Sequence, residues 1–197
     1  MTGESLENDD TQRMLQDSAR AFVSRSGGVE RARASRENAP GFDRGIWRTM
    51  AENGWFGLLF AEEHGGLDLG FAEAAIVIEE LGRCLAPEPF VSAVVLAGGV
   101  LRRGDKTPFR DEKIQALIAG EVIPALAWQE TVNDYDPIRI TTRAVSSADG
   151  VTINGRKQFI PAAAGADAYI VSAIGPDGPG LYWVEAGATG LNLALDP

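Results

Sequence analysis

The hydrophobic pattern of this chain changes its period once, near Gly120 and Glu121. Before that point apolar residues recur every three or four positions, as they do on one face of an α-helix. After it, short apolar runs and strict alternation dominate, which is the pattern of β-strands. Helices followed by strands do not make βαβ units, so the pattern predicts an α+β protein with segregated halves. We therefore expect two domains, residues 1–120 and residues 121–197.

The helical half has its clearest element in residues 71–85. Apolar or small residues fall at helical spacing there, namely Phe71, Ala74, Ala75, Ile78, Leu81, Gly82 and Leu85. This stripe predicts a helix that is buried on at least one side. Another helix is expected over residues 91–101. Asp43 predicts a capped helix start, and Thr107-Pro108 predicts a second one with proline at the first helical position.

The second half predicts strands joined by tight turns. Residues 138–143 alternate apolar and polar side chains, as a half-buried strand does. Asp149-Gly150 predicts a hairpin turn, because a type I′ turn needs positive φ at both central residues. Residues 168–185 predict two buried strands around a Pro-Asp-Gly-Pro turn, and residues 191–195 predict one more.

Charge and composition limit the partners that the chain can have. The formal net charge is -10 and the pI is about 4.6, so neither nucleic acid nor an anionic membrane is predicted as a partner. No run approaches the ~20 apolar residues of a membrane span. The N-terminal sequence is acidic and lacks the apolar segment of a signal peptide, so we expect a cytoplasmic protein. The single cysteine, Cys84, is expected in the core.

Familiar catalytic and metal-binding motifs are missing from the sequence. It has no glycine-rich dinucleotide or P-loop motif and no nucleophile elbow. The only histidine is His64, so no metal site is predicted. His64 fits a general base or a turn residue, and we favour the turn. Arg31, Arg33 and Arg36 fit a solvated helix face or a contact for an anionic ligand, and we favour the solvated face.

Segments in consistent order resemble acyl-CoA dehydrogenases. They are residues 53–69 (NGWFGLLFAEEHGGLDL), 79–83 (EELGR), 127–130 (AWQE), 149–160 (DGVTINGRKQFI) and 165–171 (GADAYIV). The resemblance implies a helical domain, then a small antiparallel β-barrel or sandwich domain, then a C-terminal four-helix bundle that these residues do not match. It also implies that FAD lies between the β-domain and the bundle.

The resemblance implies a reaction as well as a fold. In that family a glutamate of the bundle removes the α-proton of an acyl-CoA and the flavin takes the β-hydride, giving a trans-2-enoyl-CoA. Electrons then pass to an electron-acceptor flavoprotein, in fatty-acid or steroid side-chain degradation. No catalytic residue is assigned here, because the bundle glutamate matches no residue of this chain. A homo-oligomer, or a hetero-oligomer with another dehydrogenase chain, is expected.

Matched positions give the candidate site. The residues implied to contact FAD are Leu126, Trp128, Gln129, Phe159, Ile160 and Pro161. Gln129 replaces a threonine of many members, and its amide can still donate and accept hydrogen bonds. Pro161 replaces a threonine that donates to the flavin, and proline has neither a hydroxyl nor an N–H. For Trp128 and Phe159, packing in the core of the domain is as good an explanation as contact with the flavin. Tyr135 is implied to contact the CoA moiety or acyl chain.

These departures resemble a small-subunit-like branch of the family, in which a divergent chain pairs with another chain. Three hypotheses remain. The first is an FAD-dependent acyl-CoA dehydrogenase chain. The second is a non-catalytic partner subunit of a heteromeric dehydrogenase, and the third is a flavin-dependent monooxygenase of the same fold.

Overall fold

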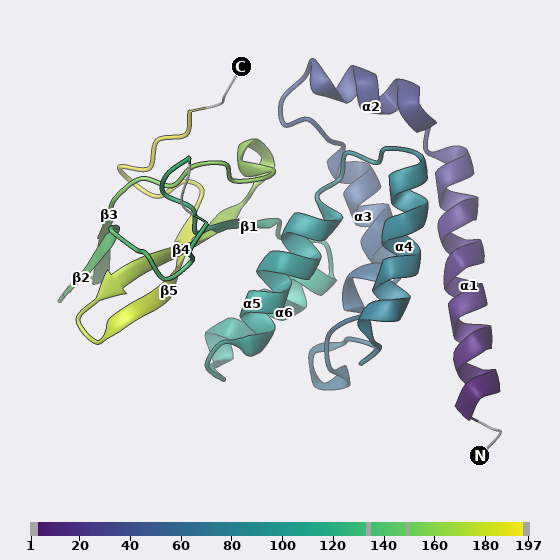
Figure 1. The fold of residues 1–197 in the computed structure, drawn as a ribbon, viewed down its shortest axis with the longest axis horizontal. Coiled ribbons are helices and arrows are strands. Elements are labelled where there is room, and N and C mark those ends of the chain that lie inside the picture. The colour runs from purple at the N-terminus through teal and green to yellow at the C-terminus, as the bar shows by residue number, and fades with distance from the viewer. Residues whose placement is uncertain (1–3, 133–134, 149, 195–197) are drawn as a thin grey trace. The chain divides into compact units, whose positions relative to one another are not determined.

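The computed structural model describes residues 4–132, 135–148 and 150–194 (Figure 1). The chain divides into two compact units, residues 1–122 and residues 123–197. The first unit is helical and the second is built on one sheet, so the predicted α+β class is confirmed. The sequence pattern placed the boundary at Gly120 and Glu121, whereas the structure divides the chain after Val122.

The helical unit begins and ends its elements at recognisable signals. Its α-helices are α1 (Glu4–Arg25), α2 (Gly28–Arg36), α3 (Arg44–Glu52), α4 (Phe71–Arg83), α5 (Gly98–Arg103) and α6 (Pro108–Ile118), with 3-10 turns η1 (Trp55–Gly57) and η2 (Glu62–His64) and a π-helix η3 (Phe90–Ala97). Asp43 caps α3 by accepting from the amide of Gly45 at 2.6 Å, and Thr107 caps α6 by accepting from the amide of Arg110 at 3.1 Å. Both caps were predicted from the sequence.

Aromatic side chains fill the core of the helical unit. Trp47, Trp55 and Phe56 are at most 1% exposed. The Trp47 and Phe56 rings lie 4.1 Å apart between centroids, and Phe22 meets Trp55 edge-on at 5.1 Å. Such buried aromatic pairs add stability beyond the area that they remove from water. The short turn η1 is buried entirely within this core.

Helix α4 runs beside α1 in the helical unit (Figure 1). It contains the predicted stripe from Phe71 to Gly82, although Phe71 at its start is 62% exposed. The helix ends at Arg83, so Leu85, the last residue of the predicted stripe, lies outside it and is 58% exposed. Two buried carboxylates of α4 face polar side chains of α1. Gln12 Nε2 donates to Glu73 at 2.8 Å, and Arg20 Nε donates to Glu80 at 3.1 Å. The interface between α1 and α4 is therefore held partly by hydrogen bonds to buried acids.

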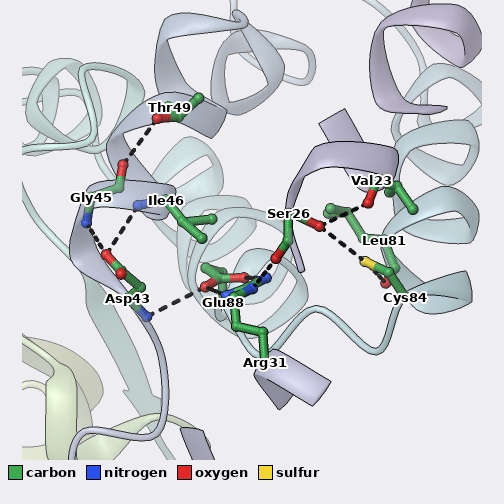
Figure 2. Close-up of polar contacts among 10 residues, drawn as sticks. All are labelled: Val23, Ser26, Arg31, Asp43, Gly45, Ile46, Thr49, Leu81, Cys84 and Glu88. Atoms are coloured by element: carbon green, nitrogen blue, oxygen red, sulfur yellow. Dashed lines mark hydrogen bonds and ion pairs between the residues drawn. The ribbon is translucent and has the colours of Figure 1, made fainter. Parts of the chain in front are cut away.

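A buried polar cluster centres on Glu88 (Figure 2). Arg31 pairs with both carboxylate oxygens of Glu88, and its Nη2 lies 3.0 Å from Oε2. Arg31 Nε also donates to the Ser26 carbonyl at 2.6 Å, and the Asp43 amide donates to Glu88 at 3.4 Å. The expectation of a solvated face is wrong for Arg31, whose side chain is 17% exposed. Next to the cluster, Cys84 is 4% exposed, as expected for a core cysteine.

The double glycine after η2 closes a compact turn. Residues 67–69 return along residues 57–60, and their amides donate to the carbonyls of Gly57, Phe60 and Leu58 at 2.8 to 2.9 Å. A Cβ at Gly66 would lie 2.0 Å from the Phe60 carbonyl oxygen. His64 belongs to this turn, and its Nε2 lies 3.5 Å from Glu63 and 3.9 Å from Asp111.

The second unit is a five-stranded mixed sheet. Its strands are β1 (Pro124–Ala127), β2 (Arg143–Ser147), β3 (Gly150–Asn154), β4 (Ala168–Gly175) and β5 (Gly178–Glu185), with a 3-10 turn η4 (Ala163–Gly165). β5 pairs antiparallel with β4 along its whole length. The other edge of β4 pairs in parallel with β1 over its first half and with β2 at Ile174. β2 and β3 form an antiparallel hairpin.

The observed pairing corrects one expectation about the sheet. Two of its pairings are parallel, so it is not the purely antiparallel sheet that was expected. Alternation along a strand fixes which side chains share a face and leaves the direction of its neighbour open. One face carries a small core of Ala125, Ala127, Ala166, Tyr169 and Val171. The strands expected over residues 168–185 are β4 and β5.

Two further strand predictions fail. Residues 138–142 are irregular, and β2 begins only at Arg143. No strand forms over residues 191–194, and Leu195 lies outside the described residues. Asp149 of the predicted hairpin turn also lies outside them, although the hairpin around it is present.

Within the described ranges no helix is long and apolar enough to cross a membrane. The same residues contain no group of three or more histidine, cysteine or acidic side chains that could hold a metal ion.

Candidate functional site

The candidate site lies where the sheet opens beside β4. β1 leaves β4 after Ala127, and the chain returns to the same edge only at Arg143. The chain between them, residues 128–142, is called the excursion here; its described residues, 128–132 and 135–142, belong to no strand. The AWQE motif forms the start of this excursion. Its two ends must be held together, because neither is part of a strand ladder.

Glu130 fastens the two ends of the excursion. Its Oε1 accepts from the Thr142 amide at 3.0 Å and from the Thr142 hydroxyl at 2.7 Å. Its Oε2 accepts from the Thr141 amide at 2.8 Å and from the Thr141 hydroxyl. These bonds occupy the amides of Thr141 and Thr142, and the amides of residues 138–140 donate to Asp136 and Ile138. Local acceptors thus take the amides that a strand over residues 138–142 would offer to a neighbour, and the predicted strand is absent.

Lys157 binds the same carboxylate and two further groups. Its Nζ donates to Glu130 Oε1 at 2.8 Å, to Ser172 Oγ at 2.8 Å and to the Trp128 carbonyl at 3.2 Å. All three ammonium hydrogens thus have acceptors. The side chains of Lys157 and Glu130 are only 6% and 8% exposed. A buried pair of this kind is tolerated because each charge is neutralised and hydrogen-bonded.

The environment of Glu130 keeps it ionised. Burial raises the pKa of its carboxyl, but the hydrogen bonds from Lys157, Thr141 and Thr142 outweigh burial and hold that pKa well below the usual range. A carboxylate with every oxygen engaged and a depressed pKa is a poor proton acceptor at neutral pH. Glu130 is therefore an anchor and not a candidate base.

Gly155 makes room for this anchor. A Cβ at position 155 would lie 2.3 Å from Thr142 Oγ1. Gly155, which follows β3, therefore allows the backbone to lie close to Thr142, which precedes β2. The close contact with Thr142 is the reason for glycine at this position.

A cavity of about 300 Å³ opens beside the anchor. Its lining comes from both ends of the excursion and comprises Trp128, Gln129, Glu130, Thr131, Asp136, Arg139, Ile140 and Thr141. Trp128 and Gln129 are both half-buried. Gln129 Nε2 donates to the Thr131 carbonyl at 3.1 Å, which orients its amide. Two of the predicted cofactor residues therefore share one cavity wall.

The other predicted residues lie elsewhere in this unit. Leu126 is half-buried on β1, on the face opposite its buried neighbours Ala125 and Ala127. Tyr135 is 73% exposed and is not part of the cavity wall.

Phe159 has an unusual backbone. Its φ is +52°, and its side chain is 54% exposed, whereas the next residue, Ile160, packs on the sheet core. Pro161 is exposed. A bulky residue in the left-handed region has a strained backbone, which persists only where the surrounding structure stabilises it. The strain turns the aromatic ring outward, so the simple strand-core interpretation of Phe159 does not apply.

The chemistry of these side chains can be compared with what an isoalloxazine ring system needs, which is aromatic contact on its faces and hydrogen bonds at its polar edge. Trp128 and Phe159 offer aromatic surfaces, and the Gln129 amide offers both donor and acceptor chemistry for the polar edge of such a ring. Pro161 can donate no hydrogen bond. The set fits a flavin held by stacking and by Gln129, without a side-chain donor from position 161.

Sequence reasoning missed the anchor itself. Glu130 and Lys157 stand in the matched motifs, but no role was assigned to them. The available signal was a charged residue of each sign inside the matched motifs AWQE and DGVTINGRKQFI. Such residues are rarely buried unless they are paired.

Comparison with known proteins agrees with the fold. Residues 9–121 match the family model described as the acyl-CoA dehydrogenase N-terminal domain, which is more than half of the chain, so the chain belongs to the acyl-CoA dehydrogenase family. Isovaleryl-CoA dehydrogenase of Arabidopsis thaliana mitochondria is 27% identical over 203 residues, covering 96% of this chain and 48% of that protein.

Solved structures are similar to both units. A structure described as the Tcur3481-Tcur3483 steroid ACAD G363A variant has a TM-score of 0.80 and 31% identity, covering 92% of this chain and 50% of that one. A structure described as PigA with FAD and proline has a TM-score of 0.78 and 25% identity, covering 93% and 50%. The chain thus spans about half the length of the relatives that it matches.

Proposed function

We propose that this chain supplies the helical and β parts of an FAD-dependent acyl-CoA dehydrogenase. The reaction is α,β-dehydrogenation of an acyl-CoA thioester to a trans-2-enoyl-CoA, with electrons passed to an acceptor flavoprotein. The observation that carries the proposal is the cavity wall of Trp128 and Gln129, at positions where the family places flavin contacts. FAD, when bound, supplies the two-electron acceptor that this reaction requires.

The residues of this chain act in binding and orientation. Trp128, Gln129 and the outward ring of Phe159 hold the ring system, and Leu126, Ile160 and Pro161 border it in the proposal. Tyr135 contacts the CoA moiety or the acyl chain. No described residue is proposed as the base. Of the two carboxylates in the cavity wall, Glu130 is fully engaged, and Asp136 accepts from the Ile138 amide and pairs with Arg139.

A second function is favoured by one relative. The steroid ACAD with 31% identity is described by two chain names, Tcur3481-Tcur3483. This supports a heteromeric dehydrogenase in which the present chain is the partner of another dehydrogenase chain that supplies the base. The same description makes a steroid-linked acyl-CoA the first substrate to test, and isovaleryl-CoA follows from the Arabidopsis relative.

The visible absorbance spectrum tests these proposals. Flavin bands in the chain alone support the binding site, and substrate bleaching with enoyl-CoA formation supports the reaction. Bands that require a co-expressed dehydrogenase-like chain support the partner subunit. A colourless protein in both settings refutes the flavin site, and oxygen consumption without enoyl-CoA refutes the dehydrogenase reaction.

Matched variants sharpen the test. Phe159→Ala removes an outward aromatic ring of the proposed site, so flavin affinity should fall. Phe71→Ala removes a ring that is similarly exposed, at 62%, on the helical unit. Equal flavin affinity in the two variants would contradict the role of Phe159.

A further inference from the structure

The proposed cofactor site has two walls, formed by two segments that are distant in sequence. Trp128 and Gln129 follow β1, whereas Phe159 follows β3. The segments meet through Lys157, whose Nζ donates to the Trp128 carbonyl across 29 positions, and through the Gln158 amide, which donates to the Gln129 carbonyl at 2.8 Å. Successive residues of one segment thus bind successive carbonyls of the other.

We propose that Lys157 is a positioning residue of this site, which fixes the Trp128-Gln129 main chain against the segment that carries Phe159. The inference rests on the proposed function, because the distance between the Trp128-Gln129 main chain and the segment of Phe159 matters only if both contact one ligand. In this proposal Lys157 does not bind the ligand itself. It acts through the Trp128 carbonyl and through the carboxylate of Glu130.

Burial of a lysine at this place is hard to explain by stability alone. Its side chain is 6% exposed beside a Glu130 side chain that is 8% exposed, and desolvating both charges offsets most of their attraction. What the ammonium adds is geometry. It joins three segments by binding the Trp128 carbonyl, the Glu130 carboxylate and the Ser172 hydroxyl at once.

The shape of the cation matters for the same reason. An ammonium directs its three donors tetrahedrally, whereas the guanidinium of arginine is a larger planar fork. Arginine at position 157 would keep the charge beside Glu130. It would not place donors on all three acceptors within the same buried space.

The main test compares three full-length variants with the wild type. Lys157→Met removes the ammonium, and Lys157→Arg keeps the ion pair so that folding is retained. Val171→Ala is the control, because it trims the sheet core on which Ile160 packs but removes none of the hydrogen bonds that join the two segments. Amide hydrogen exchange at Gln158 is read against that of Ala186, whose amide donates to the Asp167 carbonyl at 2.8 Å, and FAD affinity is read by fluorescence titration.

Positioning predicts a local effect. In both Lys157 variants the Gln158 amide should exchange faster relative to Ala186, and FAD affinity should fall by about tenfold to a hundredfold, since small displacements in a site are costly. The Val171 variant should leave the ratio of the two exchange rates unchanged and lower FAD affinity less.

Two results overturn the inference. One is unchanged Gln158 exchange in the Lys157→Arg variant. The other is FAD affinity in the Lys157 variants that equals that of Val171→Ala, since a merely structural lysine would act as the control does. If the wild type binds no FAD, the proposed function fails, and the exchange of Gln158 still decides whether Lys157 positions the segment.

Discussion

Gly65 and Gly66 are adjacent, and the structure requires glycine at each position for a different reason. Gly65 has φ +84°, and a Cβ there would meet nothing within 4 Å. Gly66 does not have positive φ, but a Cβ there would lie 2.0 Å from the carbonyl oxygen and 2.4 Å from the carbonyl carbon of Phe60. We therefore expect Gly65→Ala to be tolerated far better than Gly66→Ala.

The contacts give the size of each effect. Alanine at position 65 costs about 1–2 kcal/mol for a left-handed backbone, partly offset by a stiffer unfolded chain. Alanine at position 66 meets backbone, which no rotamer change can relieve. Residues 67–69 must move away from residues 57–60, and three hydrogen bonds of 2.8 to 2.9 Å weaken. At about 1 kcal/mol each, Gly66→Ala should cost about 3 kcal/mol or more.

Urea unfolding followed by far-UV circular dichroism measures both variants. A loss of about 3 kcal/mol moves the midpoint by roughly 1 M or more, whereas Gly65→Ala should move it by less than half of that. The reasoning fails if Gly66→Ala unfolds at the same urea concentration as Gly65→Ala. It also fails if Gly66→Ala is as stable as the wild type.

Three other outcomes are expected. Glu88→Ala leaves Arg31 buried without its partner and should cost about 3–5 kcal/mol in urea unfolding, whereas the double change Arg31→Met with Glu88→Met should cost clearly less. Asp43→Ala removes the cap of α3 and should cost about 1 kcal/mol by the same assay, against no change for Asp43→Asn. The folded state holds the pKa of Glu130 below its usual range, so its contribution to stability is present above that range and is lost as the pH falls below about 4.3. Unfolding of the strand unit at about pH 7 and about pH 3 should show this loss, and Glu130→Gln should reduce the difference between the two pH values.

Local signals in the sequence predicted the elements that depend on local physics. The apolar stripe of α4, the caps at Asp43 and Thr107 and the β4–β5 hairpin all depend on neighbours within a few residues. Of the two strands expected to be buried, β4 is buried over most of its length, whereas β5 has no fully buried residue. The helix expected over residues 91–101 is present as the π-helix η3 followed by α5. An apolar run does not distinguish a π-helix from an α-helix, so the sequence pattern could not predict the change.

Long-range contacts decided the rest. Residues 138–142 carry the alternation of a strand, yet the carboxylate of Glu130 takes the amides of Thr141 and Thr142. Arg31 has the helical context of a surface residue, yet it pairs with Glu88 from 57 positions away. In the candidate site, motif matching placed Trp128 and Gln129 together, but it gave no sign that Lys157 would join them to the segment of Phe159.

The pairing of β4 also bears on how this unit folds. Its β5 edge forms a hairpin closed by a short turn, whereas its β1 edge requires contacts such as the one between Ile123 and Asp167, which are 44 positions apart. Closing the longer loop costs more chain entropy, and non-local pairings slow folding. We therefore expect the β4–β5 hairpin to form early and β1 to dock late. The candidate site follows directly after β1, so it is completed only when the slowest pairing of the sheet has formed.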